Sequence, residues 1–379
     1  MQTLEPVGYF QSARNQSPFG CHSMLKYISV KNYKSISEAT LGNLNAINII
    51  VGKSASGKTA LLEAIRVGMS GLPSTLWNTS ANRGGFLPMP QPPSSDAFES
   101  AWRPFFHDFN THERISIELV DGMGRHAAIG AFIDRSTFMT VPTNVMPNGN
   151  IVSSSSINPF VMERINFAGE SSRLSAYMNQ HQGFVFEPGP ELGYPSEIIS
   201  STMPVNFHQV ANWFSSLSID DQEHDIVQTV CAAFPNIAGI TVQSMQGVPQ
   251  LYASLRSQNR KLPLTSVSSG INKFVSILIA MKVHAGGAIL IDEIENGIYF
   301  EMLPLLWETI SLFTETTHTQ VFATTHSLEC LHSAASVLGT QPDRYSLIQV
   351  AQETGRTELY LSTGRDATNA IRGQIEVRR

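Results

Sequence analysis

The chain has 379 residues, of which 42% are hydrophobic and 15% are charged, and its formal net charge is −6 at neutral pH. This length suits two domains, or one large α/β domain that carries an insertion. No apolar run reaches the roughly 18 residues of a membrane helix, and the first residues do not resemble a secretion signal. The acidic balance gives no overall reason to expect nucleic-acid binding, and three widely spaced cysteines match no metal motif, which favours a cytoplasmic protein with reduced thiols.

The N-terminal part of the chain leads from an irregular extension into a strand, a loop and a helix. Residues 1–24 are rich in Ser, Gln, Asn and Gly and predict a flexible extension. Short strands are expected at 27–30 and 39–41, and the apolar run 46–51 predicts a buried strand. A helix should follow from about Lys58 to Gly68, with Leu61, Leu62, Ile65 and Val67 mainly on its buried face.

Residues 73–206 differ in composition and predict an insertion into the main domain. The prolines between residues 72 and 95 exclude a regular helix or a central strand there. Alternating residues predict a hairpin of 114–120 with 127–133. From residue 140 to about 204 the chain is rich in Pro, Gly, Ser and Asn, with short helices expected near 159–166 and 171–180. The absence of sustained heptads argues against a long coiled-coil arm.

Beyond residue 206 apolar strands alternate with helical segments. Such alternation predicts an α/β fold with a mostly parallel sheet flanked by helices on both faces. The antiparallel hairpins and the irregular insertion would be added to it. The expected elements are helices at 207–217, 221–233, 270–285, 300–313 and 328–337 and strands at 240–244, 250–255, 288–291, 320–323 and 345–350.

The strongest motif of the sequence is a phosphate loop. Its residues are Gly52, Lys53, Ser54, Ala55, Ser56, Gly57, Lys58 and Thr59, which match the pattern G-x-x-x-x-G-K-[ST]. The motif stands between an apolar strand and a helix, as a phosphate-binding loop requires, because the backbone N–H groups and the helix N-terminus together attract phosphate oxygens. We therefore expect the chain to bind a nucleoside triphosphate, with Lys58 at the β- and γ-phosphates and the Thr59 hydroxyl on Mg²⁺.

Two later strands end in residues that could complete such a site. Asp292 and Glu293 follow the apolar run 288–291, so Asp292 is a candidate to hold Mg²⁺ and Glu293 to deprotonate the attacking water. His326 follows the run 320–324 and is a candidate to contact the γ-phosphate. Ser268 and Gly270 precede an apolar helix, where they fit either phosphate binding or a simple helix cap.

Together these motifs resemble the ABC-type ATPases of the structural-maintenance, Rad50 and RecF kind, and more closely the AAA15/AAA21 branch related to the overcoming-lysogenization-defect (OLD) proteins. The resemblance covers residues 25–70 and 207–378. It rests on the segments Leu25–Ile36, the phosphate loop, Ser268–Lys273, Ile291–Gly297, Ala323–Ser327 and Ile375–Arg378.

The resemblance implies an ABC-type P-loop fold and a homo-oligomer in which two protomers enclose ATP. Ser268 and Gly270 would then contact the γ-phosphate held by the partner's Lys58, although the sequence departs from the Leu-Ser-Gly-Gly-Gln of transporters. Residues 295–297 would form the loop that crosses between protomers. Glu293 would be the catalytic base, His326 would sense the γ-phosphate, and ATP turnover would be slow. The family's glutamine loop would lie after Gly71.

The resemblance also bears on what the ATPase would serve. OLD nucleases carry a C-terminal Toprim nuclease domain, for which the 53 residues after His326 are too few. We therefore expect a stand-alone ATPase that controls a separate effector protein, a nuclease or a toxin, in bacterial anti-phage defence. The alternatives are a RecF- or Rad50-type ATPase of DNA repair, for which the clusters Lys26, Lys31, Lys34 and Arg372, Arg378, Arg379 give thin support, and a nucleotide-dependent binding module that does not hydrolyse ATP.

Overall fold

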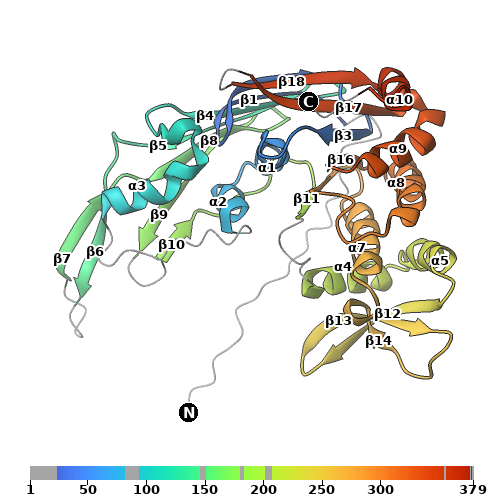
Figure 1. Cartoon of the computed structure of the whole chain (residues 1–379). Coiled ribbons are helices and arrows are strands. Elements are labelled where there is room, and N and C mark those ends of the chain that lie inside the picture. Colours follow the sequence, from blue (N-terminus) through green and yellow to red (C-terminus); the bar gives the residue numbers. More distant parts are fainter. Residues whose placement is uncertain are drawn as a thin grey trace, which may run out of the picture.

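The computed structural model describes residues 24–81, 94–145, 151–179, 183–200, 207–353, 356–375 and 377. Its central sheet has six strands in the order β11-β15-β16-β3-β17-β18 (Figure 1). The first five of these strands are parallel, and β18 pairs antiparallel with β17. The strands are β3 (Ile47–Val51), β11 (Ser196–Ile199), β15 (Ala288–Ile291), β16 (Gln320–Thr324), β17 (Tyr345–Glu353) and β18 (Arg356–Thr363). The predicted parallel sheet is thus confirmed, and the sequence analysis did not foresee β11 or β18.

The second sheet is larger than the central one and entirely antiparallel. Its seven strands lie in the order β10-β9-β8-β5-β4-β1-β2. They are β1 (Leu25–Tyr33), β2 (Ile36–Gly42), β4 (Ile115–Asp121), β5 (His126–Ile133), β8 (Phe160–Ile165), β9 (Ser171–Asn179) and β10 (Gly183–Phe186). The expectation of a mostly parallel sheet therefore holds for the central sheet, whereas the antiparallel part is a full layer of the fold.

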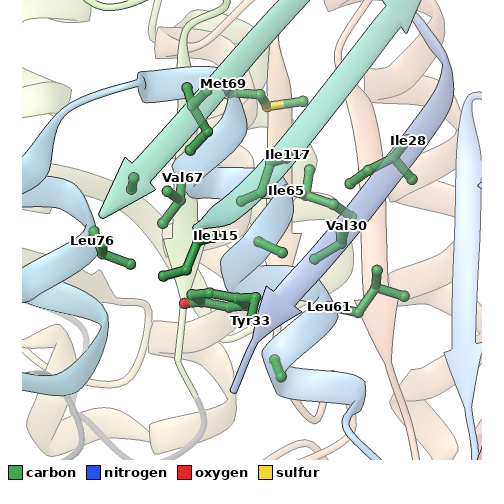
Figure 2. Packing of buried hydrophobic residues seen from close by; sticks show 14 of the residues in the cluster. Ile28, Val30, Tyr33, Leu61, Ile65, Val67, Met69, Leu76, Ile115 and Ile117 are labelled. Carbon is green, nitrogen blue, oxygen red and sulfur yellow. The ribbon is translucent and has the colours of Figure 1, made fainter. Parts of the chain in front are cut away.

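Helix α1 (Lys58–Ser70) lies between the two sheets. Its flank toward the second sheet packs Leu61, Ile65 and Val67 against side chains such as Val30 and Ile117 (Figure 2). Every residue of α1 except Thr59 and Arg66 is buried. The predicted burial of Leu61, Leu62, Ile65 and Val67 is confirmed, and protein covers the helix on nearly all sides.

The opposite face of the central sheet is covered by α7 (Ser269–Val283), α8 (Leu303–Thr317) and α9 (Leu328–Val337). Side chains of a strand point alternately to the two faces of the sheet, so they belong to two different hydrophobic cores. In β3, Ile47 and Ile49 belong to the core under these helices, while Ile50 belongs to the core around α1. Helices therefore lie on both faces as predicted, but one face is closed by α1 together with the second sheet.

A smaller region lies at the lower right of Figure 1. It contains helices α4 (Phe207–Ile219), α5 (His224–Ala233) and α6 (Leu264–Val267) and a sheet of β12 (Ile237–Met245), β13 (Val248–Leu255) and β14 (Leu262–Pro263). Helix α10 (Gly364–Arg372) packs near α9 at the end of the chain. The predicted α4, α5, β12 and β13 are confirmed. In the described residues, no helix combines the length and apolar character needed to cross a membrane.

The structure corrects the prediction for the segment 73–206 in two places. Residues 73–81 form a helix, α2 (Pro73–Ala81), which a proline permits because Pro73 occupies the first helical position, where no N–H partner is lost. The helices expected at 159–166 and 171–180 are strands β8 and β9, which pair with each other. The other elements of this segment are α3 (Ser95–Trp102) and the hairpin β6 (Met139–Val145) with β7 (Ile151–Ile157).

Strand β11 lies within the predicted insertion but pairs in parallel with β15 of the central sheet. The division into residues 25–72 with 207–379 and an insertion 73–206 stays a prediction. The prolines at 88, 90, 92 and 93 and the N-terminal extension up to residue 23 lie outside the described residues. Short 3-10 turns complete the fold at Arg103–Phe105, His107–Phe109, Phe300–Met302, Leu338–Thr340 and Pro342–Arg344.

Candidate nucleotide site

The phosphate loop runs from the end of β3 into the start of α1 and has a backbone that requires glycine. Gly57 has φ of 104°, a region that other residues rarely adopt. A Cβ on Gly52 would lie 2.3 Å from the carbonyl oxygen of Val350 on the neighbouring strand. The N–H of Ser56 donates to the carbonyl of Lys53, which closes the loop as a tight turn. This backbone fits the cradle that the sequence predicts for phosphate oxygens.

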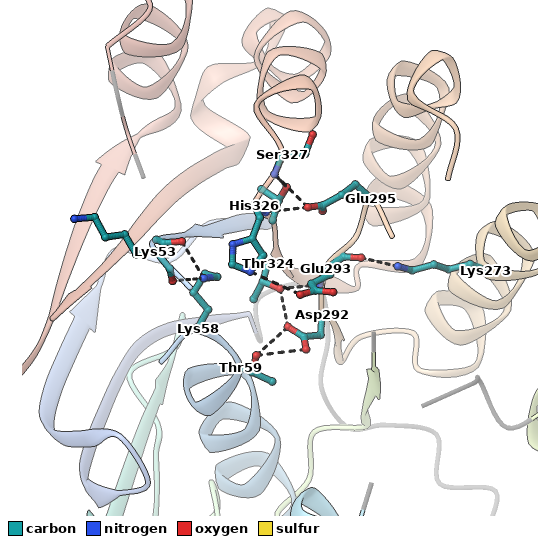
Figure 3. A network of polar contacts seen from close by, with 12 residues as sticks. Lys53, Lys58, Thr59, Lys273, Asp292, Glu293, Glu295, Thr324, His326 and Ser327 are labelled. Carbon is teal, nitrogen blue, oxygen red and sulfur yellow. Dashed lines mark hydrogen bonds and ion pairs between the residues drawn. The ribbon is translucent and has the colours of Figure 1, made fainter. Parts of the chain in front are cut away.

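Lys58 lies across this loop, as Figure 3 shows. Its ammonium donates to the carbonyl oxygens of Gly52, at 2.9 Å, and of Lys53, at 2.7 Å. Burial lowers the pKa of Lys58, while the carboxylates of Asp292 and Glu293 act in the opposite direction. The side chain therefore presents a partly desolvated cation whose recorded bonds are to neutral oxygens, a setting in which an anion would bind strongly.

Asp292 joins the phosphate loop to the central sheet. It follows β15, and its carboxylate accepts hydrogen bonds from the hydroxyls of Thr59, at 3.2 Å, and of Thr324, at 2.7 Å. Mg²⁺ prefers hydroxyl and carboxylate oxygens and commonly takes only one or two from the protein when phosphates supply the rest. The described residues contain no cluster of three or more His, Cys, Asp or Glu able to hold a metal alone. Thr59 and Asp292 therefore fit a magnesium ion bound together with a nucleotide.

Glu293 and His326 face each other beside this group. The distance from His326 Nε2 to Glu293 Oε1 is 3.7 Å, and both side chains are 39% exposed. Glu293 has φ of 46°, and its N–H donates to the Thr324 hydroxyl at 2.8 Å. A non-glycine residue with such a φ is uncommon, and strain of this kind concentrates at functional sites. The carboxylate and the imidazole are thus accessible and held next to the phosphate loop.

Ser268 and Gly270 have their contacts elsewhere. Ser268 caps α7, since its hydroxyl accepts from the N–H of Ile271. Gly270 packs so closely on the loop after Glu293 that a Cβ would lie 2.5 Å from the carbonyl oxygen of Gly297. Within the part of the chain that the structure describes, Ser268 bonds to α6 and α7, and Gly270 packs on this loop rather than on the phosphate loop. Three of the four motifs therefore meet within one chain, and the fourth does not.

The close approach at Gly270 has a measurable consequence. We expect Gly270→Ala to destabilise the protein by about 1–3 kcal/mol, because the added methyl must displace the backbone at Gly297. The matched control is Gly239→Ala, where a Cβ would meet nothing within 4 Å and φ is not in the left-handed region. Urea unfolding of the two variants gives the comparison, and equal midpoints would contradict the packing described here.

The sequence analysis missed a polar cavity of about 300 Å³ beside Thr59 and Asp292. Burial raises the pKa of Glu197 in its wall, an effect that the nearby Arg66 opposes. A second wall residue, Glu63, forms an ion pair of 2.7 Å with Lys34. The remaining lining comes from α2, from β11 and the residue after it, and from α4, through Thr75, Asn78, Thr79, Ile198, Ser200 and Gln209. The polar residues after β11, Ser200 among them, could have indicated this cavity, because the carboxyl end of β11 lies at the same sheet edge as Asp292.

Comparisons with known proteins agree with this geometry. A family model described as "AAA domain, putative AbiEii toxin, Type IV TA system" matches residues 190–331, and a model described as "AAA domain" matches residues 27–183. An ATP/GTP phosphatase of Helicobacter pylori is 24% identical over 340 residues, which are 83% of this chain and 88% of the relative. The chain is therefore similar to AAA-type P-loop proteins in both halves of its length.

Other proteins match less of the chain or match it at lower identity. An uncharacterized protein of Methanocaldococcus jannaschii is 42% identical over 52 residues, 14% of this chain and 24% of the relative. Among solved structures, an SMC head bound to the C-winged helix domain of ScpA has a TM-score of 0.49 at 11% identity, with 91% of this chain and 99% of the other covered. The SMC head domain from Thermotoga maritima has a TM-score of 0.40 at 13% identity, with 89% and 99% covered.

Proposed function

We propose that this ATPase binds ATP with Mg²⁺, hydrolyses it slowly, and uses the cycle to control a separate effector protein. The observation that carries the catalytic part is the meeting of Lys58, Thr59–Asp292 and Glu293–His326 at the carboxyl end of the parallel sheet. Open α/β folds bind their ligands at this edge. A cation, an oxygen pair for a metal, and a base beside an imidazole are the groups that phosphoryl transfer to water needs.

Each residue then has one task. The Lys58 ammonium would leave its carbonyl partners for the β- and γ-phosphate oxygens, and Thr59 and Asp292 would hold Mg²⁺, which neutralises phosphate charge when bound. Glu293 would take the proton of the attacking water as its oxygen bonds to the γ-phosphorus and the bond to the β–γ bridging oxygen breaks. The products are ADP and inorganic phosphate. His326 would orient the γ-phosphate and the water from the other side of the Glu293 carboxylate.

The position of Ser268 and Gly270 supports a site completed by a second copy of the chain. Both residues lie at the start of α7, and their recorded contacts do not reach their own phosphate loop. In a dimer of the kind the sequence resemblance implies, they would face the nucleotide on the partner's Lys58. ATP would then hold the two protomers together, and hydrolysis would release them.

The effector role rests on the description of the matching family, which names a toxin and a toxin–antitoxin system. We infer that this ATPase belongs to a bacterial defence module in which ATP-dependent assembly restrains or releases a nuclease or a toxin encoded elsewhere.

The decisive test of the proposed function is the mass of the protein co-expressed with its genomic neighbours, measured with and without ATP and Mg²⁺. We expect a discrete assembly that contains a neighbouring protein and changes in size when ATP is added. Light scattering coupled to gel filtration reports the mass, and native mass spectrometry identifies the partner. A protein that stays a lone monomer under both conditions would contradict both the dimer and the effector role.

The repair alternative has less support from the surface charges. Lys31 forms an ion pair of 2.7 Å with Glu38, Lys34 pairs with Glu63, and Lys26 donates to the carbonyl of Leu44. These lysines therefore form no basic face for a phosphate backbone. We expect duplex DNA to leave ATP turnover unchanged, measured as phosphate release with and without a 40-base-pair duplex at low and moderate salt. Stimulation that falls steeply with salt would instead favour a repair ATPase.

A further inference from the structure

The loop of residues 293–297 is fastened to α7 at two points. The first is the close packing of Gly270 on the Gly297 carbonyl. The second is Lys273, whose ammonium donates to the carbonyl oxygens of Glu293, at 2.6 Å, and of Asn296, at 3.1 Å (Figure 3). Gly270 and Lys273 are three residues apart and so occupy the same face of the helix. The first turn of α7 and this loop are therefore held together at both points.

Lys273 is an unusual residue for this position. Only 9% of it is exposed, and burial lowers its pKa to about 8 although the carboxylates of Glu295 and Glu293 lie nearby. Its recorded hydrogen bonds go to backbone carbonyls. Burying an ammonium in this way costs free energy, which a leucine or methionine of similar size would avoid. The hydrogen bonds from Lys273 to the loop offset this cost, and a leucine or methionine could not form them.

The other side of the same loop is tied to the histidine turn. One carboxylate oxygen of Glu295 accepts from the N–H of His326, at 2.9 Å, and from the N–H of Ser327, at 3.2 Å. The loop itself turns tightly, with the N–H of Asn296 donating to the Glu293 carbonyl. A continuous set of bonds thus runs from the start of α7 through Lys273 to Glu293, and from Glu295 to His326.

We propose that Lys273 is a positioning residue that transmits the engagement of the first turn of α7 to Glu293 of the same chain. This inference rests on the proposed function. When Ser268 and Gly270 meet the nucleotide on the partner, the displaced turn carries Lys273 with it and sets the backbone from which the Glu293 carboxylate projects. Each protomer would then hydrolyse its own ATP only when its α7 is seated on the other site, which couples the two sites.

The proposed coupling predicts that Lys273→Met lowers kcat far more than it changes ATP affinity. This change removes the ammonium while keeping a buried side chain of similar length. We expect kcat to fall about 10- to 100-fold, because a base displaced by as little as 1 Å loses about that much, whereas ATP affinity changes less than threefold. We also expect the rate to depend sigmoidally on ATP in the wild type and hyperbolically in Lys273→Met. The measurements are steady-state phosphate release and equilibrium binding of a fluorescent ATP analogue.

The matched control is Lys282→Met, which changes the other lysine of α7. Lys282 pairs with Asp225 away from the loop, so its loss should leave kcat and the shape of the ATP curve unchanged. Equal kcat values for Lys273→Met and the wild type would overturn the proposal. So would a fall in kcat that Lys282→Met reproduces, since both would then report only the stability of the helix.

The mass of the protein with ATP distinguishes a failure of this proposal from a failure of the proposed dimer. Ser269→Arg adds a bulky side chain at the exposed start of α7 and should abolish the ATP-dependent dimer. Lys273→Met should keep that dimer, measured by light scattering, while its kcat falls, because Lys273 acts on the Glu293 of its own chain. A wild-type protein that stays monomeric with ATP would overturn the dimer. A Lys273→Met variant that loses the dimer together with its activity would overturn the positioning role.

Discussion

Replacement of Lys58 by alanine is expected to weaken ATP binding about 100-fold or more. The ammonium is buried, its recorded partners are two neutral carbonyls, and phosphate oxygens would be far better acceptors. Truncating one member of a buried, hydrogen-bonded charge pair costs about 2–5 kcal/mol. Isothermal titration of the variant with ATP and Mg²⁺, under conditions where the wild type saturates, measures the loss.

The control for this experiment stands in the same loop. Lys53 is exposed and contributes its backbone carbonyl to Lys58, so Lys53→Ala keeps the loop and should change ATP affinity less than threefold. Thermal unfolding of both variants without nucleotide shows whether the fold is intact. ATP affinity that survives the loss of Lys58 in a folded protein would rule out the phosphate-loop assignment.

Glu293→Gln should separate binding from hydrolysis. The amide keeps the size of the carboxylate but cannot accept the proton of water, so turnover should fall roughly 100- to 10,000-fold. ATP affinity should be kept, and the ATP-bound oligomer should persist because it cannot hydrolyse its nucleotide. Phosphate release and gel filtration with ATP provide the two readouts.

Glu301→Gln provides a nearby comparison for Glu293, the proposed catalytic base. Glu301 is exposed and lies eight residues further along, so its neutralisation should leave turnover within twofold of the wild type. Unchanged turnover in Glu293→Gln would remove this residue from the role of base and direct attention to His326, whose Nε2 lies 3.7 Å from it.

The sequence predicted the central sheet because its strands are short apolar runs next to recognisable motifs. The runs 46–51, 288–291 and 320–323 need only local reading, and the motifs mark where each strand ends. Strand β9 shows where this reading failed. Leu174, Ala176 and Met178 alternate and are buried, a spacing of two that indicates a strand, but the surrounding polar residues suggested a helix in a loop region.

The residues of the candidate site also divide into those that the sequence predicted and those that it did not. Lys58, Thr59, Asp292, Glu293 and His326 could be grouped in advance because parallel strands end at a common edge. The hydrogen bonds from Lys273 to the carbonyls of Glu293 and Asn296 could not be predicted, because they depend on how α7 packs against a loop about twenty residues away. Glu197 and the cavity beside Thr59 were also missed, since β11 comes from a segment that looked irregular.

The membership of β11 in the central sheet limits how this protein can be re-engineered. A chimera that replaced residues 73–206 as one block would remove Ser196–Ile199, the strand that pairs with β15 directly before Asp292. The N–H of Asp292 donates to the carbonyl of Ile199, so the excision would leave the backbone of Asp292, the proposed magnesium ligand, without its neighbouring strand. Grafts of the antiparallel layer from a related chain would have to end before Ser196 and keep that strand from the host.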